Sequence, residues 1–305
     1  MLVFAIGRGV TQPWYMHFGK SQLLPVTQYV GSRVDLAFSV PVVAQTDKTN
    51  ELRQYYRVLH RFWGPQHWWP AETRFEVIVG AYLTQNTAWT NVERALANLR
   101  AAALLSIEGI RRVRRRRLER LIQPSGYFRQ KAERLKTFVA FLDKEYGGSL
   151  SRLFFQPTDK VREELLRLNG VGPETADSIL LYAGNHPVFV VDAYTRRILA
   201  RHEILPEKSE YENVRQLMEV ALGPLASHQT TLPTNSAIQA ESGTRGAAHP
   251  PSAISTAPRT PLVQVYNEMH GLLVGVGKQY CRKSQPQCDG CPLQRFLPRG
   301  KQVAC

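Results

Sequence analysis

The sequence predicts an all-α protein, and three features of the 305-residue chain lead to that fold class. Apolar residues recur at helical spacing in successive segments between residues 52 and 279. Short breaks rich in Gly and Pro separate these segments, for example at 64–70 and 123–126. A third feature, over 165–177, has the pattern of a helix, a tight hairpin and a second helix. A chain of this length holds about two domains.

The chain is strongly basic, with a formal net charge of +14 and a pI near 9.9. This balance favours a polyanionic partner, most simply nucleic acid, although ribosome-associated and membrane-surface proteins are also basic. No run of about 18 apolar residues is present, and the N-terminus lacks the charged and apolar blocks of a signal peptide. We therefore expect a cytoplasmic protein that binds no membrane and that is associated with the nucleoid if the protein is bacterial.

The N-terminal part is expected to contribute little to the fold. Residues 1–48 show no sustained period, so we interpret them as a poorly ordered extension or as translation from a start codon set too early. From Leu52 to Trp63 the apolar residues follow helical spacing. The break after this helix contains Trp68 and Trp69, and adjacent aromatics in a Pro-bounded loop do not easily face one core. They are either a hydrophobic plug between two domains or a stacking wall for a base turned out of a duplex.

A strongly apolar helix is predicted over 75–87, and another helix begins near Trp89. The helix over 75–87 ends with Gln85 and Asn86, so we expect their side chains to project from the end of this buried helix. Alternatively, Gln85 only caps the helix end. Seven arginines between 111 and 120 retain apolar spacing, which predicts a basic helix. Its charge is either a solvated face or a source of additional phosphate contacts. A turn near 123–127 then opens a long helix to about residue 146.

The hairpin within 165–177 has the features of a phosphate-binding backbone. Gly170 and Gly172 flank one apolar residue, which suits a turn with unusual backbone angles, and Pro173 suits the first position of a helix. The exposed N–H groups and the positive end of that helix cradle a phosphate without side-chain charge. The candidate DNA-binding residues of the hairpin are Asn169, Gly170, Val171, Gly172 and Thr175.

About twenty residues after the hairpin glycines, Asp192 follows the apolar run 188–191 and precedes a helix over 193–200. The helical pattern continues to about residue 222. Residues 225–260 are rich in Ser, Thr, Pro and Ala and carry few large apolar side chains, so we expect a disordered insertion. Helical structure is predicted to resume over 262–279.

The hairpin and Asp192 together resemble the helix-hairpin-helix motif and the catalytic aspartate of the endonuclease III superfamily of base-excision DNA glycosylases. Three further strings, in order along the chain, are similar to the 3-methyladenine DNA glycosylase III type. They are Trp68-Trp69-Pro70, Leu83-Thr84-Gln85-Asn86-Thr87 and Pro124-Ser125-Gly126-Tyr127-Phe128-Arg129-Gln130-Lys131-Ala132. The resemblance covers about 50–200.

This resemblance implies a two-domain helix-hairpin-helix DNA glycosylase fold. A six-helix barrel would span 72–186, and a second helical domain would combine 50–71 with 187–305, including a cysteine loop at 281–305. The implied partner is double-stranded DNA containing a damaged base. A monomer would bind it in the groove between the domains, with Asp192 at the mouth of the groove.

The implied reaction is hydrolysis of the N-glycosidic bond of an extruded base. Asp192 is the candidate catalytic residue, which stabilises the developing sugar cation, activates water, or does both. Its alternative role, as the N-cap of the following helix, is compatible with catalysis. Lyase-active members carry a lysine two residues after the last hairpin glycine, and that amine attacks the sugar. This chain has Glu174 there, which predicts a monofunctional glycosylase that leaves the strand intact.

The base pocket implied by the resemblance consists of Trp68, Trp69, Trp89, Glu174 and Lys278, and Gln85 matches the residue that enters the gap left by the extruded nucleotide. Tryptophan rings attract a flat cationic base, so the predicted substrate is an alkylated purine such as 3-methyladenine. The alternatives are an exposed first-turn carboxylate for Glu174 and an ordinary surface lysine for Lys278. Two other functions stay open: a glycosylase for uracil, a mismatched base or an oxidised base, and a non-catalytic helix-hairpin-helix DNA-binding protein.

All four Cys residues lie within 281–305, which favours a metal site over a disulfide framework. Cys281, Cys288 and Cys291 have the C-x6-C-x2-C spacing of the superfamily's 4Fe–4S loop. The expected position of the fourth ligand holds Leu297, so Cys305 would have to reach back from farther along the chain. The predicted cofactor is a 4Fe–4S cluster, with zinc on four thiolates or an empty relic as alternatives. No catalytic metal is expected.

Overall fold

The computed structural model describes residues 42–227 and 249–299, which belong to one compact unit, Pro41–Cys305. Within these residues the regular structure is entirely helical, which confirms the all-α class. No helix in the described ranges is long and apolar enough to cross a membrane. Most of the predicted N-terminal extension lies outside the described residues. Its last part, 42–48, is helical, so the predicted extension is too long at this end.

The helices arise where apolar spacing predicts them, although several ends differ. In chain order they are α1 (Val42–Trp63), α2 (Arg74–Leu83), α3 (Trp89–Ala101), α4 (Ile107–Arg112), α5 (Arg115–Leu121), α6 (Phe128–Tyr146), α7 (Leu150–Phe154), α8 (Thr158–Leu166), α9 (Pro173–Ser178), α10 (Ala193–Arg201), α11 (Tyr211–Ala226) and α12 (Pro261–Gln279). A 3₁₀ turn, Gln123–Ser125, precedes α6, and a π-helical stretch, Ile179–Ala183, continues α9.

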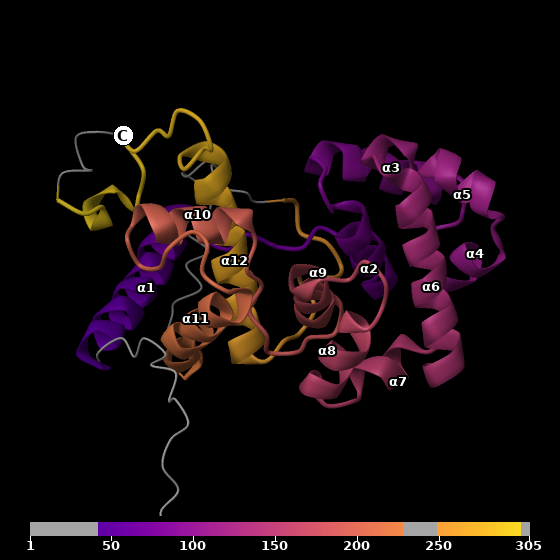
Figure 1. Ribbon diagram of the computed structural model, residues 1–305, viewed down its shortest axis with the longest axis horizontal. Helices are drawn as coiled ribbons and strands as arrows, with labels where there is room; N and C mark the ends of the chain where they lie inside the picture. The colour runs from indigo at the N-terminus through magenta and orange to yellow at the C-terminus, as the bar shows by residue number, and fades with distance from the viewer. Residues whose placement is uncertain (1–41, 228–248, 300–305) are drawn as a thin grey trace, which may run out of the picture. The chain divides into compact units, whose positions relative to one another are not determined.

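The helices pack in two neighbourhoods that share the π-helical stretch. Helix α12 packs against α1, α10 and α11, whereas α2 packs against α3, α6, α9 and the π-helical stretch (Figure 1). Helix α12 also contacts the π-helical stretch, so the two neighbourhoods meet at this point in the chain. The division of the chain into a barrel over 72–186 and a second domain remains a prediction.

The predicted helix over 75–87 ends earlier, at Leu83, because its last carbonyl groups find a different partner. The Lys131 ammonium, only 1% exposed, donates to the carbonyl oxygens of Leu83 (2.8 Å) and Ser125 (2.6 Å). A cation at a helix C-terminus is favourable because it satisfies carbonyl groups that have no partner within the helix. Burial lowers the pKa of Lys131 to about 8. The residues after Leu83 are therefore free to form the turn that presents Gln85.

The predicted basic helix over 111–120 is instead two short helices, because Val113 has extended backbone angles between α4 and α5. Three of its arginines form ion pairs with carboxylates of α4, α5 or α6. These pairs are Arg111 with Asp143, Arg112 with Glu108, and Arg115 with Glu119. Since these groups are exposed or half-exposed, the pairs contribute little to stability. Part of this charge is thus neutralised within the protein.

The predicted insertion over 225–260 is shorter at both ends than expected. Residues 225 and 226 complete α11, and 249–260 have defined positions, while 228–248 lie outside the described residues. Residues 249–260 are ordered by polar contacts with 64–71, the segment after α1 that contains Trp68 and Trp69 and is called the tryptophan loop below. Ile254 N–H donates to the Ala71 carbonyl (3.1 Å), and Ala71 N–H donates to Ser252 Oγ (3.2 Å). Hydrogen bonds of this kind do not show in a count of apolar side chains, which is why composition predicted disorder here.

Candidate active site

The hairpin has the tight turn that its glycines predict, but only one of them needs glycine's backbone freedom. Gly170 has φ +78°, whereas Gly172 is extended at φ −93° and ψ 175°, so the expectation of unusual angles is wrong for Gly172. A Cβ on Gly170 would also lie 1.9 Å from Arg134 Nε, so a larger residue there would displace the Arg134 side chain as well. Pro173 occupies the first position of α9, as predicted.

Gln85 is held against the hairpin in this structure. Its amide Nε2 donates to the Gly170 carbonyl and to Thr175 Oγ1, both at 2.9 Å, and its Oε1 accepts from Arg134 (2.6 Å). Asn86 follows with a left-handed φ of 53° and is exposed. The turn after α2 and the hairpin are thus one contact region. The predicted DNA-binding residues on both lie together there, with Asn169 and Gly172 exposed and Val171 buried.

Asp192 caps α10, and the same geometry leaves it beside a buried histidine. Its Oδ1 accepts from the Thr195 N–H at 2.7 Å, and its Oδ2 lies 3.5 Å from His270 Nε2, too long for a strong hydrogen bond. Burial alone would raise the pKa of Asp192. The interaction with His270 and the hydrogen bonds from Thr195 outweigh it and hold the pKa below its ordinary value. A carboxylate that stays ionised in this position can stabilise a cation.

His270 and Tyr182 are site residues that the sequence analysis missed. The Tyr182 hydroxyl is hydrogen-bonded to His270 Nδ1, and both side chains are buried. Burial first, and then the charge of Asp192, raise the pKa of Tyr182 well above its ordinary value, so this hydroxyl stays protonated. The usable signal was a histidine directly before the apolar run 271–277 of α12.

Three tryptophans form a group that reaches His270, the neighbour of Asp192: the centroids of the Trp68 and His270 rings are 6.1 Å apart. The ring centroids of Trp68 and Trp69 are 5.8 Å apart, and Trp89 lies 6.5 Å from the first and 5.1 Å from the second. Trp68 and Trp69 are 5% and 4% exposed, so the expectation that adjacent tryptophans do not share one core is wrong. We call these three rings, with Tyr182, His249 and His270, the aromatic cluster.

Two further residues complete the surroundings of the aromatic cluster. Lys278 Nζ lies 5.8 Å from the centre of the Trp68 ring. Burial lowers the pKa of Lys278 below its ordinary value, and the charges of Glu93 and Asp192 offset only part of this effect. His249 lies 5.4 Å from Trp68, ring centre to ring centre, and its Nε2 is buried without a hydrogen-bond partner. His249 lies within the predicted insertion over 225–260, where neither period nor motif drew attention to it.

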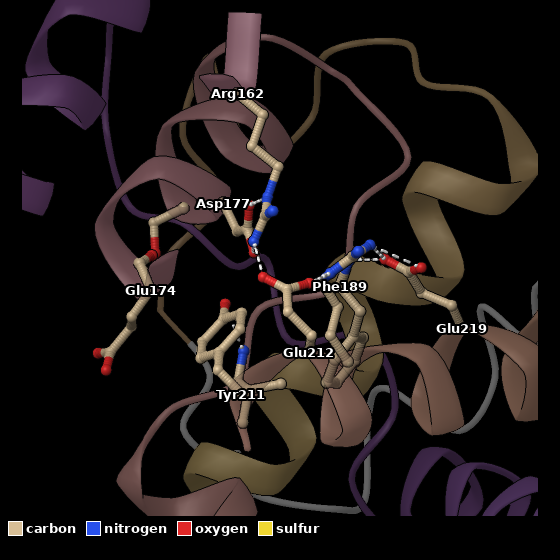
Figure 2. A network of polar contacts seen from close by, with 10 residues as sticks. Arg162, Glu174, Asp177, Phe189, Tyr211, Glu212 and Glu219 are labelled. Atoms are coloured by element: carbon tan, nitrogen blue, oxygen red, sulfur yellow. Dashed lines mark hydrogen bonds and ion pairs between the residues drawn. The ribbon is translucent and has the colours of Figure 1, made fainter. Parts of the chain in front are cut away.

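Glu174, on the first turn of α9, is near enough to Asp192 to interact with its charge. Burial first, and then the negative charge of Asp192, raise the pKa of Glu174 to about 7, although the side chain stays open to solvent. In Figure 2 its carboxylate points away from the polar contacts of Asp177 and Arg162. The structure therefore brings all five predicted pocket residues into the surroundings of Asp192, and Glu174 forms the solvent-open part.

The cysteine loop brings three cysteines to one place: Cys281 and Cys291 are free thiols, whereas Cys288 is disulfide-bonded. Cys281, Cys288 and Cys291 line the same small cavity after α12, together with Leu297, and the Arg201 guanidinium donates to Cys281 Sγ at 3.2 Å. Burial raises the pKa of Cys291 to about 11. In the described part of the chain no three His, Cys, Asp or Glu side chains form a group that could hold a metal ion. Cys305 lies outside the described residues, so the donor set visible here is incomplete for a cluster.

A helical fold, a helix-hairpin-helix and a buried carboxylate near a cluster of aromatic rings define a class, the helical base-excision DNA repair enzymes. The chain belongs to the family described as "HhH-GPD superfamily base excision DNA repair protein", which matches residues 79–224. It is 38% identical over 254 residues to "Putative DNA repair glycosylase MJ1434" of Methanocaldococcus jannaschii, covering 82% of this chain and 97% of that protein. The family expected from the sequence is thereby confirmed, and the protein is a base-excision DNA glycosylase.

Solved structures agree with this assignment. The 3-methyladenine DNA glycosylase of H. pylori bound to 1,N6-ethenoadenine matches with a TM-score of 0.59 and 27% identity, covering 76% of this chain and 97% of that one. A trapped covalent intermediate of endonuclease III with DNA matches with a TM-score of 0.60 and 19% identity, covering 84% and 99%. The second match shows the shared fold.

Proposed function

We propose that this protein is a monofunctional glycosylase that releases alkylated purines, such as 3-methyladenine, from duplex DNA. The observation that carries the proposal is the gathering of Trp68, Trp69 and Trp89 in a group that reaches His270, the neighbour of Asp192. Flat aromatic walls attract a planar cation by stacking and cation–π interaction, and an alkylated purine is such a cation. The match to a 3-methyladenine DNA glycosylase at 27% identity supports the same choice. A monomer acting on one damaged base is the form that we infer.

In the proposed reaction the bond between the sugar C1′ and the base nitrogen breaks, and its electron pair leaves with the base. For a base that is already cationic, this electron pair neutralises the leaving group, so no strong acid is required. The positive charge that develops on the sugar is stabilised by the Asp192 carboxylate. Water then adds to C1′, and Asp192 is placed to accept its proton. The products are the free base and an abasic site in an intact strand.

The proposal that strand cleavage is absent depends on Glu174. A glutamate in the first turn of α9 has no amine, so it cannot form a Schiff base with the opened sugar. Borohydride should therefore fail to trap a covalent complex on damaged DNA, while Glu174→Lys supplies a matched positive control. Efficient trapping of the wild type would mean that another amine attacks the sugar, and the monofunctional assignment would be wrong.

A panel of otherwise identical duplexes tests the substrate class. Each duplex carries one base: 3-methyladenine, 1,N6-ethenoadenine, uracil, thymine opposite guanine, or 8-oxoguanine. We expect 3-methyladenine to be released fastest under single-turnover conditions. Fastest release of uracil or of an oxidised base would replace the proposed substrate class. Release of no base at all would leave only binding through the helix-hairpin-helix.

We also propose that the cysteine loop holds a 4Fe–4S cluster in the manner of the endonuclease III superfamily. Supporting it are the three cysteines that line one cavity, two of them free thiols, and the cation that Arg201 directs at Cys281. Cys305 is the candidate fourth ligand. The cluster would stabilise the loop near α10, and no catalytic step requires it. Protein purified anaerobically should be brown and contain about four irons per chain, and Cys305→Ser should lower that content; colourless, iron-free protein would contradict the proposal.

A further inference from the structure

The segment that delivers Asp192 has no regular structure to hold it. Residues 188–191 are at most 1% exposed, and they form neither a helix nor a strand. Buried backbone N–H groups need partners, and α11 supplies two of them from its side chains. Phe189 N–H donates to Glu219 Oε1 at 2.9 Å, and Val191 N–H donates to the Tyr211 hydroxyl oxygen at 3.2 Å (Figure 2).

The same helix is tied to both helices of the hairpin motif. Arg162 of α8 donates to Asp177 of α9 (2.6 Å) and to Glu212 of α11 (2.6 Å), as the dashed lines in Figure 2 mark. Asp177 is fully buried, and its negative charge helps to raise the pKa of Tyr211, after burial of the Tyr211 side chain itself. The Tyr211 hydroxyl, which accepts from the peptide group next to Asp192, is therefore also close enough to the second hairpin helix to interact with its buried carboxylate.

Arg215 extends this framework along α11. Its guanidinium donates to Glu212 and to Glu219, each at 2.8 Å, so the carboxylate that holds Phe189 N–H is itself fixed. Connected and satisfied networks of this kind are stiff, because each group restricts the rotamers of its neighbours. The hairpin, which meets the DNA backbone in this family's fold, and the catalytic carboxylate thus share one rigid support.

We propose that Tyr211 and Glu219 are positioning residues that fix Asp192 at a set distance from the phosphate held by the hairpin. The proposal rests on the proposed catalytic role of Asp192. Neither side chain touches DNA in this account: both act through the backbone of 188–191. A carboxylate displaced by about 1 Å loses much of its effect on a transition state, so the consequence falls on the rate of base release and not on DNA affinity.

Tyr211→Phe removes one oxygen atom and keeps the ring over which Arg196 lies. Tyr146→Phe is the matched control, because its buried hydroxyl also bonds a carboxylate, that of Glu164, but far along the chain from Asp192. We expect Tyr211→Phe to slow single-turnover release of 3-methyladenine about tenfold to a hundredfold. Its affinity for a duplex with a tetrahydrofuran abasic analogue should match the wild type, and Tyr146→Phe should keep the wild-type rate.

Glu219 provides a rescue experiment. Glu219→Gln keeps an acceptor for Phe189 N–H and should retain most of the rate, whereas Glu219→Met, of similar size, lacks one and should lose rate as Tyr211→Phe does. Asp192→Asn is measured alongside. Full activity of Asp192→Asn would sink the catalytic assignment itself. An inactive Asp192→Asn with a wild-type rate for Tyr211→Phe, or equal loss in both tyrosine variants, would overturn the positioning role alone.

Discussion

At the scale of single residues, the proposed chemistry depends on how Asp192 is kept ionised. The carboxylate is mostly enclosed, with 13% of its side chain exposed, and enclosure alone favours its neutral form. The Thr195 N–H at the start of α10 and the side chain of His270 reverse that preference. The cap and the catalytic group are therefore one arrangement, because the positive end of a helix stabilises the negative charge that catalysis requires.

Asp192→Asn is expected to abolish base release while leaving DNA binding near that of the wild type. Asparagine is as good an N-cap as aspartate, so α10 and the hairpin should keep their structure, but the charge that stabilises the sugar cation is lost. Release of 3-methyladenine and binding to an abasic-analogue duplex are measured on the same preparation. A variant that releases base normally would mean that another group supplies the negative charge.

Glu174 predicts a pH dependence of the rate. Its pKa, raised to about 7 by burial and by the charge of Asp192, makes it neutral below that pH and ionised above it. An ionised Glu174 adds negative charge next to a developing cation, so single-turnover release should rise several-fold, on the order of 1 kcal/mol of barrier, between about pH 6 and 8. Glu174→Gln should flatten this rise. Glu163→Gln, on the exposed side of α8, is the control, and a rise that survives Glu174→Gln would assign the titration elsewhere.

Sequence alone could locate Asp192, Glu174 and the tryptophans, because each follows a local pattern of hairpin, spacing or string. It could not locate Tyr182, His249, His270 or Tyr211. These residues reach the site from separate elements, and tertiary packing, such as that of α12 on the π-helical stretch and of α11 on α12, brings them there. A single histidine in a mostly buried helix is compatible with many roles until its neighbours are known.

At the scale of elements, the tryptophan loop is fastened to α12 by a buried carboxylate. Glu268 is 4% exposed; its Oε2 accepts from the Gln66 N–H at 2.8 Å and its Oε1 accepts from Gln264 at 2.9 Å. Burial, opposed by these hydrogen bonds and by the charge of Arg259, raises the pKa of Glu268 to about 7. The loop that presents Trp68 thus depends on a group that titrates near neutrality.

The sign of the resulting pH dependence of stability follows from the direction of that shift. The unfolded carboxyl has its ordinary pKa, so between about pH 4.5 and 7 the folded protein binds more protons than the unfolded chain. The contribution of Glu268 to the free energy of unfolding therefore falls as the pH rises through this window. Glu268→Gln should remove that fall. Between pH 5 and pH 8 the free energy of unfolding of the variant should therefore fall by about 1–3 kcal/mol less than that of the wild type.

Urea unfolding of both proteins at pH 5 and pH 8 measures this difference, and Glu163→Gln again serves as the surface control. If the free energy of unfolding changes equally between the two pH values in the wild type and in Glu268→Gln, then Glu268 does not titrate in this range. Asp177 and Glu174 also have raised pKa values, so they contribute equally to both proteins and cancel in the comparison.

Helices were predicted best where buried apolar residues recur at helical spacing. They were predicted worst where polar contacts determine at which residue a helix ends. The apolar face of α2 and the long run of α6 are visible as spacing. The early end of α2 depends on Lys131, which lies 48 residues away from Leu83 in the sequence. The division of the arginine stretch into α4 and α5, and the order of 249–260, likewise depend on backbone angles and hydrogen bonds that no period reveals.

At the scale of the whole molecule, the net charge of +14 and the position of the site suit a long, flexible polyanion. Charge brings the protein to DNA without selecting a base, because phosphate contacts carry no sequence information. In the proposed mechanism, selection then occurs at the aromatic cluster, after the base has left the stack. Affinity and base choice are therefore separable, and variants of the aromatic walls should change only the second.

The aromatic walls should favour a cationic purine over a neutral pyrimidine. Stacking contributes about 1–3 kcal/mol per base, and cation–π attraction adds to it only for the alkylated base, so 3-methyladenine should be released tens to hundreds of times faster than uracil. Trp68 and Trp69 are buried, and their replacement by alanine would cost several kcal/mol of stability. Trp89, which is only partly buried, is the better test.

Trp89→Ala should lower release of 3-methyladenine about tenfold and leave uracil release almost unchanged, while Trp89→Phe, which keeps an aromatic face, should retain most of the preference. Lys278 opposes a cationic base at the same wall, because its ammonium lies over Trp68. The predicted preference therefore requires stacking to exceed that repulsion, which the lowered pKa of Lys278 makes easier. The measurement is the single-turnover rate for each base in the three proteins. Faster uracil release by the wild type, or an unchanged 3-methyladenine rate in Trp89→Ala, would show that these walls do not select the base.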